Sequence, residues 1–280
     1  MNIPKKNLLI LLAAFTAAMV TTAYADLNAP ITNWINDPVT PLAEGVRTNF
    51  YLMCALTMPF FFGPIIALIY AMYRFDAKRN PKPATWHDNL PLEIAWTVIP
   101  ALLLVVAAFV TYPLLVSFKN PPKARPDLVV EVVGQQFFWQ YTYPRYDVTV
   151  VDDGTGVSPL VLPVDKVVTF NGTASQVNHA WWVPAFGIKF DVIPGRISNA
   201  WAQVKREGFY KGQCAELCGQ GHALMWIHVK VVSDEEFRRF ILSKNPEATF
   251  DDKTTVAETP SESLVDIAAA NMTNKKEIGQ

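Results

Sequence analysis

Charged side chains are scarce in this sequence, and neither sign is in excess. Asp, Glu, Lys and Arg make up 18% of the 280 residues, against about 25% in an ordinary soluble domain. The 24 basic and 25 acidic residues give a formal net charge of −1, so nothing suggests a general affinity for nucleic acid. Only 3 cysteines occur, too few for a disulfide-stabilised scaffold. Hydrophobic residues reach 51%, which excludes a disordered chain or a coiled coil.

The hydrophobic residues gather near the N-terminus, in three blocks without charge. The first block follows Lys5 and Lys6, is apolar from Leu8 to Val20 and ends in Ala-Tyr-Ala. A basic start, a short apolar run and small residues before a cleavage point predict a secretory signal peptide over residues 1–25. An uncleaved membrane anchor is the alternative, although the apolar run is short for a membrane span.

The other two blocks predict a transmembrane hairpin over residues 48–118. Thr48–Tyr73 has 26 uncharged residues and Ile94–Phe118 has 25, and both exceed the length of about 20 that a spanning helix needs. Prolines interrupt both blocks, which membrane helices tolerate better than soluble helices do. A buried hairpin of a soluble protein is the alternative.

The flanking charges predict the orientation of this hairpin. The connection between the two blocks carries four basic residues, whereas the N-terminal outer segment, residues 26–47, has only Arg47. Basic loops stay inside, so residues 26–47 and everything after Phe118 are expected outside the cell membrane.

Beyond a proline-rich linker at residues 119–126, short β-rich runs alternate with turn residues. They predict an all-β domain over residues 127–233, with a β-sandwich or Greek-key barrel as its fold. Residues 234–280 are expected to form a short amphipathic helix, ending near Lys244, and a loosely ordered tail. The predicted strands cover residues 128–133, 137–143, 166–171, 178–183, 188–193, 201–204 and 226–232.

Metal-binding residue types gather near the end of the β domain. Cys214, Cys218, His222 and Met225 lie within one short segment, and His179 precedes them. Thiolate, thioether and imidazole donors together select copper. A single-copper site for electron transfer uses one cysteine. The second thiolate therefore points to two cysteines bridging two copper ions, with one histidine and a weak axial donor for each.

Two other interpretations remain open for the same residues. An oxidising compartment favours a disulfide between Cys214 and Cys218, but a disulfide does not explain two histidines and a methionine beside it. Zinc binds two cysteines and two histidines, but the spacing is unusual for zinc and Met225 would have no role. His87 and His228 have no ligand neighbours in sequence and are expected on the surface.

These motifs resemble subunit II of the haem–copper cytochrome c oxidases, of the bacterial type. The strongest is Gly-Gln-Cys-Ala-Glu-Leu-Cys-Gly-Gln-Gly-His-Ala-Leu-Met at residues 212–225, and shorter likenesses lie at 91–97, 178–184 and 191–196. The resemblance covers roughly Pro91 to Val232, with the same two-helix hairpin before it. It implies a cupredoxin-like Greek-key barrel, in agreement with the predicted strands.

The resemblance also implies a role for each ligand residue. The two cysteines match the bridging thiolates of the dinuclear copper A centre. The carboxylate of Glu216 matches a magnesium ligand at the contact with subunit I. The remaining copper ligands are His179 and Met225 for one copper, and His222 and the Glu216 carbonyl for the other.

The implied function is electron uptake for a respiratory terminal oxidase. This subunit would take electrons from a cytochrome c and pass them to haem in subunit I, where oxygen is reduced and protons are moved, so no catalytic residue is expected here. Glu93 matches a glutamate at the mouth of a proton-uptake path, although a carboxylate there is ordinarily an interface anchor. The expected location is the bacterial inner membrane, with the copper domain on the periplasmic side. A quinol-oxidase subunit and a solitary membrane-tethered copper protein are the alternatives.

One segment departs from the family pattern. Residues 134–139 read Gly-Gln-Gln-Phe-Phe-Trp, where the family has Gly-His-Gln-Trp-Tyr-Trp. Phe137 replaces the tryptophan that receives electrons, and of the two tryptophans only Trp139 remains. Together with Phe137 and Trp139, Asp191 is expected to lie where the electron donor docks. From Lys119 onward 17 basic and 19 acidic residues leave a net charge of −2, which is weak for steering a basic cytochrome c. We expect a slow reaction with such a donor or a different small redox protein, unless Phe137 is merely a tolerated aromatic.

Overall fold

The computed structural model describes residues 37–82, 84–123, 125–250 and 260–277, with side chains of the last helix as far as Ala270. The predicted signal peptide lies outside these residues. The described chain divides into two compact units, one formed by residues 45–117 and one by the described residues before Gly45 and after Ser117.

The first unit consists mainly of two long apolar helices, α2 (Pro41–Arg74) and α3 (Leu90–Lys119). Both are long and apolar enough to cross a membrane, and the predicted spans lie inside them. Each contains two prolines, which membrane helices accommodate. Thr111 Oγ1 donates a hydrogen bond of 3.2 Å to Asn49 Oδ1 and links the two helices. Their apolar side chains are otherwise largely exposed, as expected for helices that pack against lipid or other subunits.

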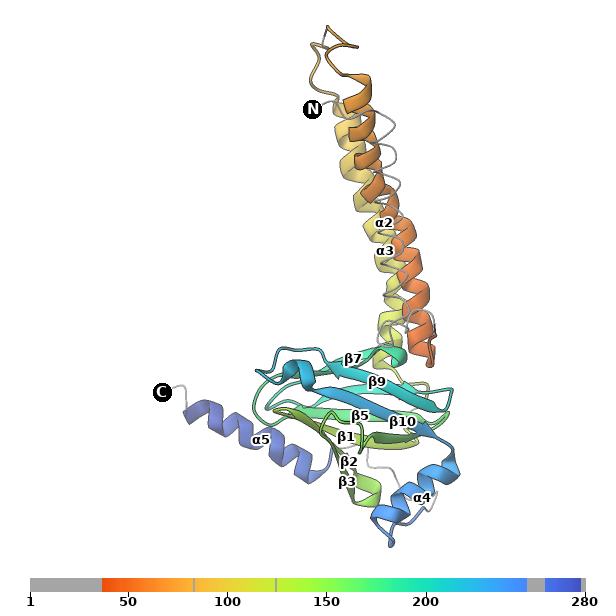
Figure 1. The fold of residues 1–280 in the computed structure, drawn as a ribbon, viewed down its shortest axis with the longest axis vertical. Coiled ribbons are helices and arrows are strands. Elements are labelled where there is room, and N and C mark those ends of the chain that lie inside the picture. The colour runs from red at the N-terminus through yellow and green to blue at the C-terminus, as the bar shows by residue number, and fades with distance from the viewer. Residues whose placement is uncertain (1–36, 83, 124, 251–259, 278–280) are drawn as a thin grey trace. The chain divides into compact units, whose positions relative to one another are not determined.

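The second unit is a sandwich of two five-stranded sheets (Figure 1). The strands of the first sheet, in spatial order, are β3 (Val148–Asp152), β2 (Phe138–Tyr143), β1 (Leu128–Gln135), β5 (Val167–Ala174) and β8 (Ser198–Gln203). Those of the second are β4 (Leu160–Pro163), β10 (Trp226–Val232), β9 (Gly208–Cys214), β6 (His179–Val183) and β7 (Ile188–Val192).

Most neighbouring strands are antiparallel, and the core lies between the two sheets. β1 pairs parallel with β5, and β10 pairs parallel with β4, whereas the other neighbours are antiparallel. The edge strands β3 and β7 alternate buried and exposed residues, because one face meets the core and the other meets solvent. Between the sheets, the Trp181 indole donates a hydrogen bond of 3.2 Å to the Tyr141 hydroxyl, and both side chains are fully buried. The prediction of two helices followed by an all-β domain is confirmed.

Three strands were absent from the sequence prediction. β3 follows β2 after a single 3₁₀ turn, β4 has only four residues, and β9 mixes glycine, lysine and glutamine with its aromatics. β4 and β9 lack the apolar alternation that identifies a strand in isolation, whereas β3 has it, with Val148 and Val150 buried and Thr149 and Val151 exposed. Tertiary pairing on both sides holds β9 in place. The short helix was predicted correctly: α4 spans Asp234–Lys244, and the Ser233 side chain accepts a hydrogen bond from Glu236 N at its start.

The polar tail contains a helix that the sequence analysis missed. α5 (Glu262–Glu277) contacts β5, and it buries Leu264 and Ala268, four residues apart on one face. Its start is held by Glu131 of β1, a carboxylate only 2% exposed, which accepts from Ser261 N at 2.6 Å and Ser261 Oγ at 2.7 Å. A buried carboxylate needs such partners. Glu131 and Ser261 lie 130 residues apart in sequence.

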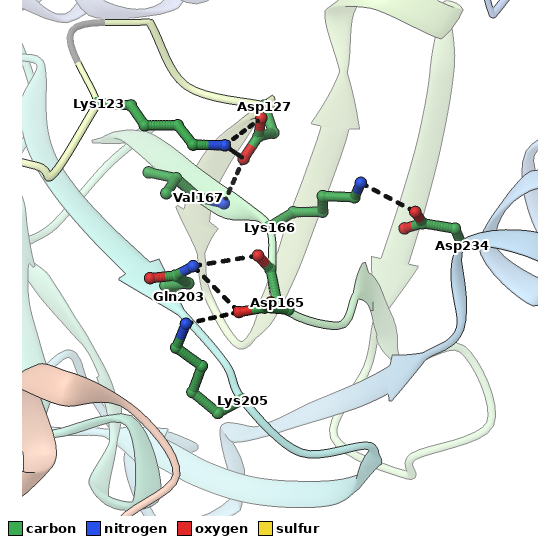
Figure 2. A network of polar contacts seen from close by, with 8 residues as sticks. All are labelled: Lys123, Asp127, Asp165, Lys166, Val167, Gln203, Lys205 and Asp234. Atoms are coloured by element: carbon green, nitrogen blue, oxygen red, sulfur yellow. Dashed lines mark hydrogen bonds and ion pairs between the residues drawn. The ribbon is translucent and has the colours of Figure 1, made fainter.

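Polar contacts secure the point where the linker enters the sandwich (Figure 2). Asp127 accepts hydrogen bonds from Lys123 Nζ at 2.9 Å and from Val167 N at 2.8 Å. The bond to Val167 lies directly before the parallel pairing of β1 with β5. Lys166 bonds to Asp234 at the start of α4 at 2.9 Å. The ion pairs are largely exposed and contribute little each, so the backbone contact at Val167 matters most.

Replacing Ser261 by Ala should loosen α5 from the sheet. The change removes the side chain that accepts from Leu264 N at 3.2 Å and that donates to Glu131, so the local stability of α5 should fall by about 1–2 kcal/mol. Hydrogen exchange across residues 262–277 measures this loss. Ser233→Ala, which removes the cap of α4, is the matched control and should leave α5 unchanged. Equal protection of α5 in wild type and Ser261→Ala would contradict the docking role.

Candidate metal centre

Strand pairing places Cys214 at one end of the second sheet. It is the last residue of β9, lies opposite Trp181 of β6, and follows Gln213, which pairs with Trp226 of β10. Cys214 N donates 3.0 Å to the carbonyl of Met225 and closes the β9–β10 hairpin. The ligand loop, residues 215–225, is therefore the connection of this hairpin, and its ends are fixed by the sheet.

Six donor groups converge around this hairpin end. Cys214 Sγ lies 3.9 Å from Cys218 Sγ, 3.7 Å from His179 Nδ1 and 3.3 Å from the Glu216 carbonyl oxygen. Cys218 Sγ lies 3.6 Å from His222 Nδ1 and 3.9 Å from Met225 Sδ. The structure thus brings together every residue that the sequence analysis proposed as a copper ligand.

The donors differ in their access to solvent. His179, Cys214, Cys218 and Met225 are buried, whereas His222 is half-buried and the Glu216 side chain is exposed. A metal held here would be shielded on the β6 side and accessible near His222.

Burial controls the protonation of two donors. It lowers the pKa of His179 to about 4, with a further contribution from His222, so this imidazole is neutral at physiological pH and ready to bind a metal. Burial, followed by the neighbouring Cys214, raises the pKa of Cys218 to about 12. Metal binding there would have to displace a thiol proton, as thiolate sites generally require.

The two sulfur atoms are not joined. Both cysteines are free, and their separation of 3.9 Å is far beyond a disulfide bond of about 2.05 Å. Thiolates bound about 2.3 Å from one metal in tetrahedral geometry would lie about 3.8 Å apart. The donor atoms of His179, Cys214 and Cys218 all lie within 4.8 Å of one another. The geometry therefore fits metal coordination.

Close packing fixes the ring of His179. A Cβ atom added at Gly134 of β1 would lie 2.9 Å from His179 Cδ2, so only glycine leaves room for the ring. On another side, the rings of Trp139 and His179 meet edge to face with centroids 5.9 Å apart. Sequence reasoning did not identify Gly134, because its role depends on a residue 45 positions away.

The three donor-docking candidates occupy different environments. Trp139 is fully buried, so any part it plays runs through His179 rather than through contact with a donor. Phe137 is half-buried and lies against the ligand loop near Gly219 and Gly221. Asp191 is exposed on β7, opposite Ala180, the residue that follows His179.

Glu93 lies in the first turn of α3, in the other unit. Its Oε1 accepts from Asn89 N at 3.3 Å, while Asn89 Oδ1 accepts from Leu92 N at 3.2 Å. This reciprocal arrangement caps the helix. The structure thus gives Glu93 a local role, and its place in a proton path stays a prediction.

The surface position expected for His228 is wrong. This residue is 3% exposed, and its backbone N donates 2.8 Å to the buried Asp152. Its ring Nδ1 lies 3.2 Å from the same carboxylate. The pair joins β10 to β3, three residues beyond Met225. Because β3 was not predicted, nothing in the sequence indicated a partner for His228.

Comparisons with known proteins show the family of this chain. The family model described as "Cytochrome C oxidase subunit II, periplasmic domain" matches residues 128–232, and the corresponding transmembrane-domain model matches residues 28–114. A probable cytochrome c oxidase subunit 2 of Rickettsia conorii is 36% identical over 75% of this chain and 71% of its own length. The chain belongs to the cytochrome c oxidase subunit II family.

Further relatives carry the same name. Subunit 2 of Cereibacter sphaeroides is 37% identical over 63% of this chain and 68% of its own length. The crystal structure of the periplasmic domain of subunit II from Bradyrhizobium japonicum is 34% identical, covers 46% of this chain and 100% of that one, and has a TM-score of 0.41. As a subunit II, the chain is part of a terminal oxidase, its two apolar helices fit a two-span membrane protein, and its His/Cys/Cys cluster is compatible with copper.

Gly134→Ala in this subunit II should displace His179. The new methyl group has no space beside the ring, so metal affinity should fall about tenfold or more, as when a ligand's orientation is lost. Competition with a chelator measures this. Gly172→Ala is the control, because the nearest atoms to its Cβ would belong to Phe190, at 2.5 Å, and Val192, at 2.6 Å, rather than to a donor group. An equal loss of affinity in both variants would show that general crowding, not His179, is responsible.

Proposed function

We propose that this chain is the electron-accepting subunit of a respiratory terminal oxidase in a bacterial inner membrane. The β domain would lie on the periplasmic side and hold a dinuclear copper A centre. The observation that carries this proposal is the convergence of two thiols, two imidazoles, a thioether and a carbonyl within one hairpin end. The proposal keeps the predicted transmembrane hairpin at residues 48–118 and the predicted β domain at residues 127–233.

Each donor has an assigned place in the proposed centre. Cys214 and Cys218 would bridge the two metals. His179 and Met225 would complete one copper, and His222 with the Glu216 carbonyl would complete the other. Zinc would not use a thioether, whereas copper accepts one as a weak axial ligand. When bound, a thiolate-bridged copper pair supplies one-electron transfer with the charge shared over both metals.

The protein's contribution is to hold these donors still. His179 is confined by Gly134 and Trp139, and Cys214 is fixed by the β9 pairing. Ligands that do not move when the charge changes allow fast electron transfer, because little reorganisation is needed. The half-buried His222 provides the side from which an electron donor can approach.

The proposed partners follow from the family. Subunit I would supply the haem that receives the electrons and would carry out oxygen reduction, and a cytochrome c or another small redox protein would supply them. The Glu216 carboxylate is exposed and would share a magnesium ion with subunit I. Glu93 would lie at the mouth of the proton path. A quinol-oxidase role is less well supported, because such subunits generally lack the copper ligands that this chain retains.

Copper analysis of the full chain tests the centre. We expect two coppers per chain after reconstitution, and one copper, or zinc, would contradict the proposal. Cys218→Ser should abolish the spectrum of the shared electron, since one bridge is lost. Met225→Leu should retain both metals and shift mainly the reduction potential, because an axial ligand tunes the potential more than it holds the metal.

Phe137→Trp tests the departure at the donor-docking region. An indole offers more π surface than a phenyl ring, so single-turnover reduction of copper by a basic cytochrome c should be faster in the variant. The measurement is repeated at low and high salt, because a weakly charged docking face should give little salt dependence. An unchanged rate at both salt concentrations would show that Phe137 is merely a tolerated aromatic.

A further inference from the structure

One side chain of the β1–β2 turn hydrogen-bonds to the ligand loop. Gln136 lies in this turn, and its Nε2 donates a hydrogen bond of 2.6 Å to the carbonyl oxygen of Cys218, 82 residues away. The Gln136 side chain is itself exposed, so it contributes little to the core. Its hydrogen bond instead ties the turn to the residue that carries the second thiol.

The neighbouring Phe137 closes over the same stretch of loop. A Cβ atom at Gly219 would lie 2.9 Å from Gln136 Nε2 and 3.2 Å from the Phe137 ring, and Gly219 has a φ of +128°. A Cβ atom at Gly221 would also collide with this ring. The two glycines therefore allow the loop backbone to approach the turn closely.

Few other contacts hold this part of the loop. At the loop's ends, Ala215 N donates 3.0 Å to Ala180 O, and Met225 O accepts from Cys214 N. Between them, His222 N donates 3.1 Å to Gly219 O within the loop itself. Ligand side chains apart, no described residue outside the loop other than Gln136 hydrogen-bonds to residues 216–222.

We propose that Gln136 is a positioning residue for the metal centre, acting with Phe137 as a clamp on the Cys218–His222 segment. The clamp holds a thiolate and an imidazole in the arrangement that binds metal, and it restricts the exposed side of the site, where strand pairing does not reach. The neutral amide also directs the positive end of its dipole toward the Cys218 carbonyl, which favours the reduced state of the centre. This inference rests on the proposed copper function.

The test compares Gln136→Met with Gln135→Met in the full chain. Methionine keeps the length of glutamine but cannot donate, and Gln135 is the matched control because its Nε2 reaches only Gln140, at 3.4 Å. In Gln136→Met, amide exchange at residues 219–222 of the copper-free chain should rise about fivefold, as the net loss of one hydrogen bond predicts. Copper affinity should fall about tenfold, and the potential should shift downward. Gln135→Met should change none of these.

The outcomes separate this inference from the proposed function. If wild type binds two coppers and Gln136→Met matches it in exchange, affinity and potential, the clamp is refuted while the copper function stands. If wild type binds no copper, the proposed function fails, whereas faster loop exchange in Gln136→Met would still reveal the clamp.

A second pair of variants tests the aromatic half of the clamp. Gly221→Ala should push the loop away from Phe137 and weaken copper binding. Phe137→Ala alone should also weaken copper binding, because half of the clamp is lost. Combined with Gly221→Ala it should cost less than the sum of the two single losses, because the new methyl group no longer strikes a ring. Losses that simply add in the double variant would show that the ring does not act on the loop, because residues in contact are expected to couple.

Discussion

The pairing of β9 between β6 and β10 is the constraint on which the metal centre depends. It sets Cys214 opposite Trp181 and, through the hairpin, brings Met225 back to the same end of the sheet. His179 begins the adjacent strand β6 and reaches the same place. Because side-chain direction alternates along a strand, a one-residue slip of β9 would turn Cys214 away from His179. The site is thus a consequence of strand register before it is a property of the loop.

Beyond this frame, the site has two halves with different physical support. Sheet pairing and core packing determine the buried half, with His179, Cys214 and Met225. The half that contains His222 depends on the ligand loop, and among the described residues outside this loop, ligands apart, only Gln136 hydrogen-bonds to residues 216–222. This asymmetry suits electron transfer, since the buried half keeps the geometry constant while the exposed half leaves a path for partners. It also explains why Gly219 and Gly221 lie between Cys218 and His222: the loop must pass directly beneath an aromatic ring.

Local patterns in the sequence predicted much of this structure. The two uncharged blocks predicted the helices, and α4 was predicted with its limits because its amphipathic period is a local signal. Four of the five ligand side chains lie within twelve residues, so their grouping was visible without a fold. The contacts that the sequence did not reveal are long-range: Gly134 against His179, Gln136 on Cys218, Asp152 with His228, and Glu131 with the start of α5. Each depends on strand order, which periodicity does not encode.

In the proposed centre, both thiolates serve two metals that share one electron. Electron paramagnetic resonance of the copper-loaded, oxidised chain tests it most directly, because the hyperfine pattern counts the nuclei over which the unpaired electron is spread. We expect a pattern from two equivalent copper nuclei in wild type, which is lost in Cys218→Ser. A pattern from a single copper nucleus in wild type would contradict it.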